Sequence, residues 1–245
     1  MLACRAMRRS PIPWRLVVPN LVTGANIAIG FCAMLAAAHG DYDLSVYLLV
    51  AAIFCDMFDG QLARRLRATS RFGQELDSLS DALSFGAAPA FLVYMALLRD
   101  LGPWGVAVSV LYLMAGTLRL ARFNVLSDAH TKERKTLGVP IPIGAGYAMA
   151  VALMRDRLDP VAGAAVMVAM ALLMVSRVRL PQMKGNGIVT WMLLVGICNY
   201  LAVVARPGWP TVIWWNLWNV VILATAWATE RRHRPEDAGA DAPAT

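Results

Sequence analysis

Eight long apolar stretches fill most of this chain, and no other feature of the sequence limits its fold so strongly. A helix needs ~20 apolar residues to cross the hydrocarbon core of a bilayer. The stretches are continuous rather than alternating, which disfavours membrane-spanning strands. The sequence therefore predicts an all-α polytopic membrane protein with about eight transmembrane helices, over residues 17–38, 44–62, 78–98, 104–124, 139–154, 160–176, 187–205 and 211–228.

Length and composition support this class. Of the 245 residues, 58% are hydrophobic and only 16% are charged, whereas ordinary soluble domains carry about 25% charged residues. Eight spans leave no room for a separate soluble domain. We expect a basic N-terminal segment over 1–16, a transmembrane domain over 17–228, and a polar tail over 229–245 that is disordered because it lacks apolar residues to bury.

The basic residues predict how the chain lies in the membrane. Lys and Arg are retained on the cytoplasmic side, and with eight spans and a cytoplasmic N-terminus 19 of the 23 fall on that side. We therefore expect both termini in the cytoplasm and the protein in the inner membrane. Because the positive charges line one membrane face, anionic lipid headgroups are a better partner than nucleic acid for the net charge of +7.

Four aspartates stand where the second stretch ends and the third begins. A carboxylate at membrane depth costs several kcal/mol unless it is paired or bound to a cation. Asp56 and Asp59 are three residues apart, and Asp77 and Asp81 are four apart, so each pair lies on one face of its helix. If the turn between the helices forms a hairpin over 56–81, all four carboxylates converge near the cytoplasmic interface.

A cluster of this kind repels itself unless cations are bound. Carboxylate oxygens without His or thiolate ligands favour Mg²⁺ or Mn²⁺ over zinc, and four carboxylates can bridge two such ions. Small residues, Gly60, Ala63 and Gly73, lie on the acidic faces and leave room for a flat ligand, and Arg64 offers a partner for phosphate. Divalent ions beside an arginine are typical of phosphoryl-type transfer.

Two structural alternatives apply to this segment. Charged residues at the ends of spans are often only interfacial caps, and small residues spaced by four are often packing contacts. A single aspartate would fit either explanation. Four aspartates at these spacings favour a cation site.

Taken together, these residues read D-x2-D-G-x2-A-R-x8-G-x3-D-x3-D, which resembles the signature of the CDP-alcohol phosphotransferase family. Within that family, further segments resemble the bacterial type II phosphatidylserine synthases. The resemblance covers about residues 19 to 146, and these segments are Pro19–Thr23, Phe72–Asp81, Ser84–Ala90, Arg119–Asn124 and Gly138–Pro142.

The resemblance implies roles for individual residues. Asp56, Asp59, Asp77 and Asp81 would bind two divalent cations, and Asp81 would also act as the catalytic base. Gly60, Arg64 and Ser70 would line the CDP part of the donor, and Asn20, Leu21 and Thr23 would approach its headgroup. With the small residues of the acidic faces, the set expected to bind CDP-diacylglycerol is Asn20, Leu21, Thr23, Gly60, Ala63, Arg64, Ser70 and Gly73.

The implied reaction transfers the phosphatidyl group of CDP-diacylglycerol to L-serine and releases CMP. Direct in-line transfer is expected, because no side chain stands as an evident nucleophile. Arg119 and Arg122, three residues apart, could bind the serine carboxylate, although positive-inside anchoring explains them equally well. Lys135, beside the Gly-Val-Pro-Ile-Pro segment, is a third candidate.

Other functions remain open on the sequence alone. Glycerol 3-phosphate or inositol phosphate could replace serine as acceptor without changing the metal site. A cation or metabolite transporter is a further alternative, since intramembrane carboxylates also mark ion pathways. A homodimer is compatible with the apolar surface of the last spans, which carry Trp191, Trp209, Trp214, Trp215 and Trp218.

Overall fold

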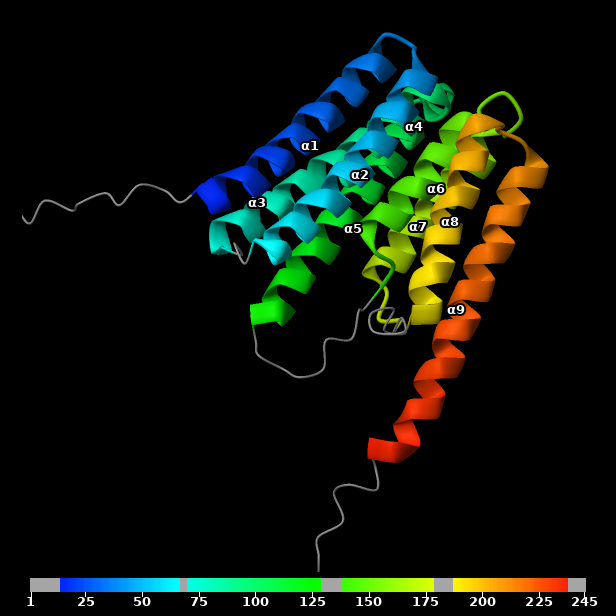
Figure 1. Ribbon diagram of the computed structural model, residues 1–245. Helices are drawn as coiled ribbons and strands as arrows, with labels where there is room; N and C mark the ends of the chain where they lie inside the picture. The colour runs from blue at the N-terminus through cyan, green and yellow to red at the C-terminus, as the bar shows by residue number, and fades with distance from the viewer. Residues whose placement is uncertain (1–13, 67–69, 129–137, 179–186, 238–245) are drawn as a thin grey trace, which may run out of the picture.

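The computed structural model describes residues 14–66, 70–128, 138–178 and 187–237, and every regular element in these ranges is a helix (Figure 1). This confirms the all-α prediction for the described part of the chain. The elements are α1 (Trp14–Ala38), α2 (Tyr42–Arg65), α3 (Arg71–Asp81), η1 (Ala82–Ala87), α4 (Ala88–Ala96), η2 (Leu98–Leu101), α5 (Pro103–Asp128), α6 (Ile141–Leu153), α7 (Pro160–Val175), α8 (Gly187–Ala205) and α9 (Trp209–Asp237).

Within the described residues, three helical segments are long and apolar enough to cross a membrane, namely Val17–Ala38, Arg71–Ala96 and Pro103–Leu126. Shorter apolar helices cover Ile141–Leu153, Pro160–Val175 and Val195–Ala205. Each predicted stretch corresponds to a helix when α3, η1 and α4 are taken as one rod. The number of spans and the side of the termini stay predictions.

Helix α1 packs along α2 and along the rod formed by α3, η1 and α4. Its buried face is made largely of small residues, including Ala33 and Ala37, which let helices approach closely. Gly30 is the tightest point, because a Cβ added there would collide with the Ser84 hydroxyl of η1. The start of α1, the end of α2, the start of α3 and the end of α5 lie at the same end of the bundle (Figure 1).

The rod changes from α to π geometry directly after Asp81. The π segment is held by two hydrogen bonds to its neighbours. Ser84 Oγ donates to the Asn26 carbonyl of α1 at 3.2 Å, and the buried Tyr112 hydroxyl of α5 donates to the Phe85 carbonyl at 3.3 Å. π-Helical turns within α-helices occur frequently at functional sites.

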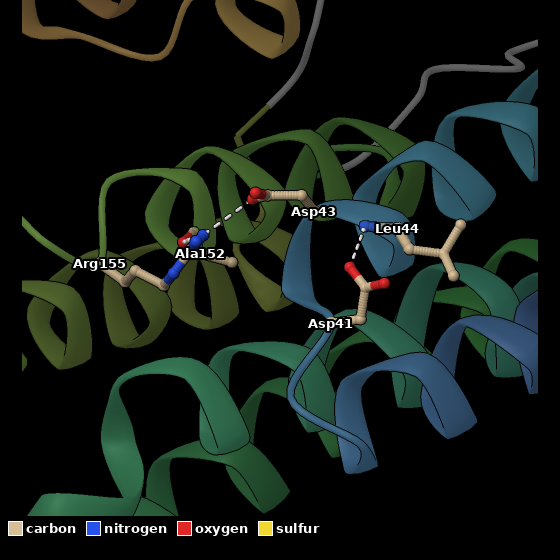
Figure 2. Close-up of polar contacts among 5 residues, drawn as sticks. All are labelled: Asp41, Asp43, Leu44, Ala152 and Arg155. Atoms are coloured by element: carbon tan, nitrogen blue, oxygen red, sulfur yellow. Dashed lines mark hydrogen bonds and ion pairs between the residues drawn. The ribbon is translucent and has the colours of Figure 1, made fainter.

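Polar contacts tie the opposite end of the bundle together (Figure 2). Arg155, which follows α6, forms an ion pair with Asp43 at the start of α2, at 2.9 Å. Asp41 caps α2 by accepting a hydrogen bond from the Leu44 N–H at 3.0 Å. Arg157 donates to the Pro207 carbonyl between α8 and α9. Arg155 and Arg157, which the charge distribution assigns to the outer side, are thus engaged in contacts between helices.

The C-terminal segment differs from the prediction. Helix α9 continues to Asp237, so residues 229–237 are helical rather than disordered. Ala, Glu and Arg, all favourable in helices, follow the apolar part of α9 and allow it to propagate. The remaining tail, 238–245, lies outside the described residues.

The contact at Gly30 generates a stability prediction. Gly30→Ala should destabilise the protein by about 1–3 kcal/mol, because α1 and η1 must separate to admit the methyl group. Gly24→Ala, on the same helix, is the matched control, since a Cβ at Gly24 meets nothing within 4 Å. Removing that glycine should be neutral or stabilise by up to about 1 kcal/mol. Thermal unfolding in detergent measures both, and equal effects would contradict the packing described here.

Candidate active site

Carboxylates from α2 and α3 meet at the end of the bundle where α1 and α3 begin. Asp56 and Asp59 of α2 and Asp77 of α3 each offer an oxygen, and these oxygens all lie within 4.8 Å of one another. The two helices run in opposite directions, which brings their acidic faces together. This confirms the predicted convergence for these three residues.

Asp81 lies deeper, beside the same cluster. Its carboxyl group interacts with those of Asp56 and Asp77, and it lies within hydrogen-bonding reach of Asp56. The Asp81 Oδ1 atom is buried and has no hydrogen-bond partner. The guanidinium of Arg119, on α5, lies close enough to act on the charge of Asp81.

Thr23 of α1 fixes Asp59 in place. Its hydroxyl lies 2.9 Å from Asp59 Oδ2 and 3.1 Å from the Pro19 carbonyl, and it can donate to only one of them at a time. Thr23 is 4% exposed and Asp59 is 2% exposed. The structure thus places Thr23, which the resemblance assigns to the surroundings of the donor headgroup, in contact with a carboxylate of the cluster.

The buried carboxylate oxygens fit divalent cations. Asp59 Oδ1 and Asp81 Oδ1 are both enclosed without a hydrogen-bond donor, and an unpaired buried anion is costly. Among the described residues, Arg119 is the cation whose charge acts on the cluster, and it does so through Asp81. An all-oxygen donor set with excess negative charge is the type that Mg²⁺ and Mn²⁺ prefer.

Three residues expected to bind CDP-diacylglycerol gather at the start of α3. Ser70 is the N-cap of this helix, and its hydroxyl accepts a hydrogen bond from the Gly73 N–H at 3.0 Å. A Cβ at Gly73 would lie only 3.1 Å from Asn20 Oδ1, so a small residue is needed where α1 passes. Ser70 therefore has a capping role in addition to any contact with ligand.

The other expected donor residues are placed differently. Gly60 lies on α2 one turn beyond Asp56, on the acidic face. Leu21 is exposed on α1. The side chains of Ala63 and Arg64, on the last turn of α2, lie outside the described part, as does the whole of Lys135.

The structure separates the two arginines proposed for the acceptor. Arg119 is buried, with its Nε unpartnered, and faces the carboxylates. Arg122 instead donates to the carbonyls of the C-terminal end of α7, at 3.0–3.3 Å, namely those of Met174, Val175 and Ser176. These are the carbonyls that a helix end leaves without intrahelical partners.

The Gly-Val-Pro-Ile-Pro segment docks on the same helix end. The N–H of Gly138 donates to the Val178 carbonyl at 2.9 Å, and that of Val139 donates to the Leu173 carbonyl at 3.2 Å. Gly138 has a φ of +72° and no space for a side chain against Met174. The irregular backbone before α6 is thus a docking contact.

Asn124 is a structural residue that the sequence analysis did not assign. Its side-chain amide donates to Ser78 Oγ at 3.0 Å and so links α5 to α3, directly after Asp77 and about one turn before Asp81. In the sequence, the indication of such a role was that polar residues recur within the Arg119–Asn124 segment. Its partner on α3 could be identified only from the packing of the two helices.

Thr23 supports a prediction about the carboxylates. Thr23→Val keeps the shape of the side chain but removes the donor to Asp59, and it should weaken divalent-cation binding by roughly 10- to 100-fold. Thr23→Ser keeps the hydroxyl and is the control. Titration calorimetry of the detergent-solubilised protein with Mn²⁺ measures both. Equal affinities for the two variants would exclude Thr23 as a support of Asp59.

Comparisons with known proteins agree with the site. Residues 16–157 match a family described as CDP-alcohol phosphatidyltransferase, and this range contains all four aspartates. The chain is 33% identical over 180 residues to CDP-diacylglycerol–serine O-phosphatidyltransferase of Helicobacter pylori, which covers 71% of this chain and 76% of that protein.

Two other relatives are similar over comparable lengths. The Bacillus subtilis protein of the same description is 31% identical over 167 residues, covering 68% of this chain and 91% of the relative. An archaetidylserine synthase of Methanothermobacter thermautotrophicus is 32% identical over 177 residues, covering 70% and 72%.

Proposed function

The chain belongs to the CDP-alcohol phosphatidyltransferase family, and on this basis we propose that it transfers the phosphatidyl group of CDP-diacylglycerol to L-serine, giving phosphatidylserine and CMP. The observation that carries the proposal is the convergence of carboxylate oxygens from Asp56, Asp59 and Asp77 within 4.8 Å. The names of the relatives support serine as the acceptor. The reaction is a step of phospholipid biosynthesis.

Asp56, Asp59, Asp77 and Asp81 would hold two divalent cations, Mg²⁺ or Mn²⁺. When bound, these ions supply positive charge that neutralises the diphosphate of the donor and the CMP leaving group. The enclosed, partnerless oxygens of Asp59 and Asp81 support this assignment. The hydroxyl of Thr23 donates a hydrogen bond to Asp59 and so orients its carboxylate.

Asp81 acts as the base. Its carboxylate takes the proton of the serine hydroxyl as the serine oxygen forms a bond to the phosphatidyl phosphorus. The bond between that phosphorus and the bridging oxygen of the diphosphate breaks, and CMP leaves with the electron pair. Arg119 lies beside Asp81.

The donor nucleotide lies between the end of α2 and the start of α3. Asn20, Ser70 and Gly73 form one side, and Gly60 of α2 lies on the other. Ala63 and Arg64, which follow Gly60 in the sequence, are assigned to the same set through the resemblance. The amide groups at the start of α3 favour an anionic ligand. Leu21 and Thr23 complete the set on α1, with Thr23 acting through Asp59.

Serine binds on the α5 side. Arg119 pairs with the serine carboxylate, because its guanidinium is buried beside Asp81 and its Nε has no protein partner. Arg122 supports this side indirectly by holding the end of α7. Lys135 remains a third candidate for contact with the acceptor.

The proposed setting is the inner membrane, with the active site near the cytoplasmic face and anionic lipids around the basic residues. The acidic residues gather at one end of a single helix pair. A transporter would be expected to place polar groups near the midplane, so this placement disfavours that alternative. A homodimer formed through the last helices stays a prediction.

The activity itself is tested by CMP release from CDP-diacylglycerol by the solubilised protein. We expect release that requires Mg²⁺ or Mn²⁺ and serine, that chelation abolishes, and that Asp81→Asn lowers by roughly 100- to 10,000-fold. Glycerol 3-phosphate and inositol phosphate are offered separately. Release with either of them and not with serine would replace the acceptor, and no cation-dependent release with any acceptor would refute the proposal.

The two arginines give a separate test. Arg119→Gln should raise the KM for serine by roughly 10- to 100-fold, since it removes a charge-assisted hydrogen bond, while the KM for CDP-diacylglycerol stays within about two-fold. Arg122→Gln is the matched variant, and it should lower the melting temperature through loss of the contacts to α7. A serine KM that rises only in Arg122→Gln would reverse the assignment. Steady-state kinetics and thermal unfolding provide the readouts.

A further inference from the structure

Asn26 of α1 is a buried polar residue that the mechanism above does not use. It is 0% exposed, and neither its amide nitrogen nor its amide oxygen has a hydrogen-bond partner. Native proteins almost always satisfy buried polar side chains, so an exception calls for an explanation. A leucine would fill the same space without that cost. The retained amide therefore indicates a functional role for this side chain.

The hydrogen bonds of α1 place Asn26 directly below the carboxylate cluster. Thr23 bonds to Asp59, and α1 runs antiparallel to α2, so Asn26 stands level with Asp56, one turn deeper in the bundle. On its other side α1 runs parallel to the rod. Ser80 Oγ donates to the Thr23 carbonyl at 3.5 Å and Ser84 Oγ to the Asn26 carbonyl at 3.2 Å. Asn26 is therefore enclosed between Asp56 and the turn that follows Asp81.

The carboxyl groups above Asn26 are arranged as a pair. Those of Asp56 and Asp81 lie within hydrogen-bonding reach of each other. Asp56 already offers one oxygen to the cluster with Asp59 and Asp77. Two carboxylates that both hold cations repel each other, so Asp81 cannot be the hydrogen-bond partner of the second Asp56 oxygen. That oxygen then needs another donor, at the level where the Asn26 amide has no partner.

We propose that Asn26 is a positioning residue for the cation site: in the loaded protein its Nδ2 donates a hydrogen bond to the Asp56 carboxylate and fixes the orientation in which the second oxygen faces a cation. This inference rests on the cation part of the proposed function. It extends that function by giving α1 a second support, one turn below Thr23. Thr23 supports Asp59, and Asn26 supports Asp56.

The test compares Asn26→Leu with the wild type in two measurements. In EDTA the variant should melt at the same temperature as the wild type or higher, because an unsatisfied buried amide is replaced by an apolar group of similar size. In a Mn²⁺ titration followed by electron paramagnetic resonance, it should bind the ion at least ten-fold more weakly. A residue with a merely structural role would lower the melting temperature and leave Mn²⁺ affinity unchanged.

Ser45→Ala is the matched control. Ser45 is also fully buried with an unpartnered hydroxyl, but it lies at the opposite end of α2 from the aspartates. Its removal should leave the Mn²⁺ titration unchanged. An equal loss of Mn²⁺ binding in Ser45→Ala would contradict the proposal, because it would show that Mn²⁺ binding does not depend on a polar group beside the aspartates.

The outcomes separate this inference from the proposed function. Wild-type Mn²⁺ affinity in Asn26→Leu overturns the role of Asn26 and leaves the cation site intact. A fall in melting temperature in EDTA, or failure of the variant to fold, assigns the amide a structural role and also overturns it. If the wild-type protein itself binds no Mn²⁺, the proposed cation site fails, and this inference fails with it.

Discussion

Repulsion among carboxylates at the end of a membrane helix pair is the constraint on which this architecture depends. Four carboxylates can lie together only if the surrounding helices hold them rigidly and a positive charge lies close to them. Thr23 of α1 donates a hydrogen bond to Asp59, and α5 places Arg119 beside Asp81. The small residues of α1 let the helices pack closely enough for this, and the Gly30 contact with η1 is the tightest example.

The helices beyond the family match have a definable packing role. Trp215 of α9 lies between Tyr147 of α6 and Tyr200 of α8, with ring centroids 4.7 and 5.0 Å apart. The Tyr200 hydroxyl donates to the Gly146 carbonyl, and the Tyr147 hydroxyl donates to Asn216. Each tyrosine ring thus packs on Trp215 while its hydroxyl group is hydrogen-bonded. The catalytic helices and the last two are joined through α6.

Local periodicity explains what the sequence could predict. The apolar stretches correspond to the helices, and the spacing of Asp56, Asp59 and Asp77 correctly predicted that their carboxylates converge, because both depend on residues near in the chain. The contacts that the sequence did not predict join distant segments. Arg122 and Asn124 bind α7 and α3, and nothing in their own neighbourhood specifies those partners. The extension of α9 to Asp237 reflects helix propagation rather than apolar content.

The π turn after Asp81 also sets the phase of the rod. A π turn accommodates one residue more than an α turn, and one residue corresponds to a rotation of about 100° around the axis. The face of α3 that carries Asp77 and Asp81 is therefore offset from the face of α4 that packs in the apolar core. Because of this extra residue, the α3 part of the rod can direct its aspartates into the site. The α4 part can direct its small apolar side chains toward α1 and α6, and the helix remains continuous.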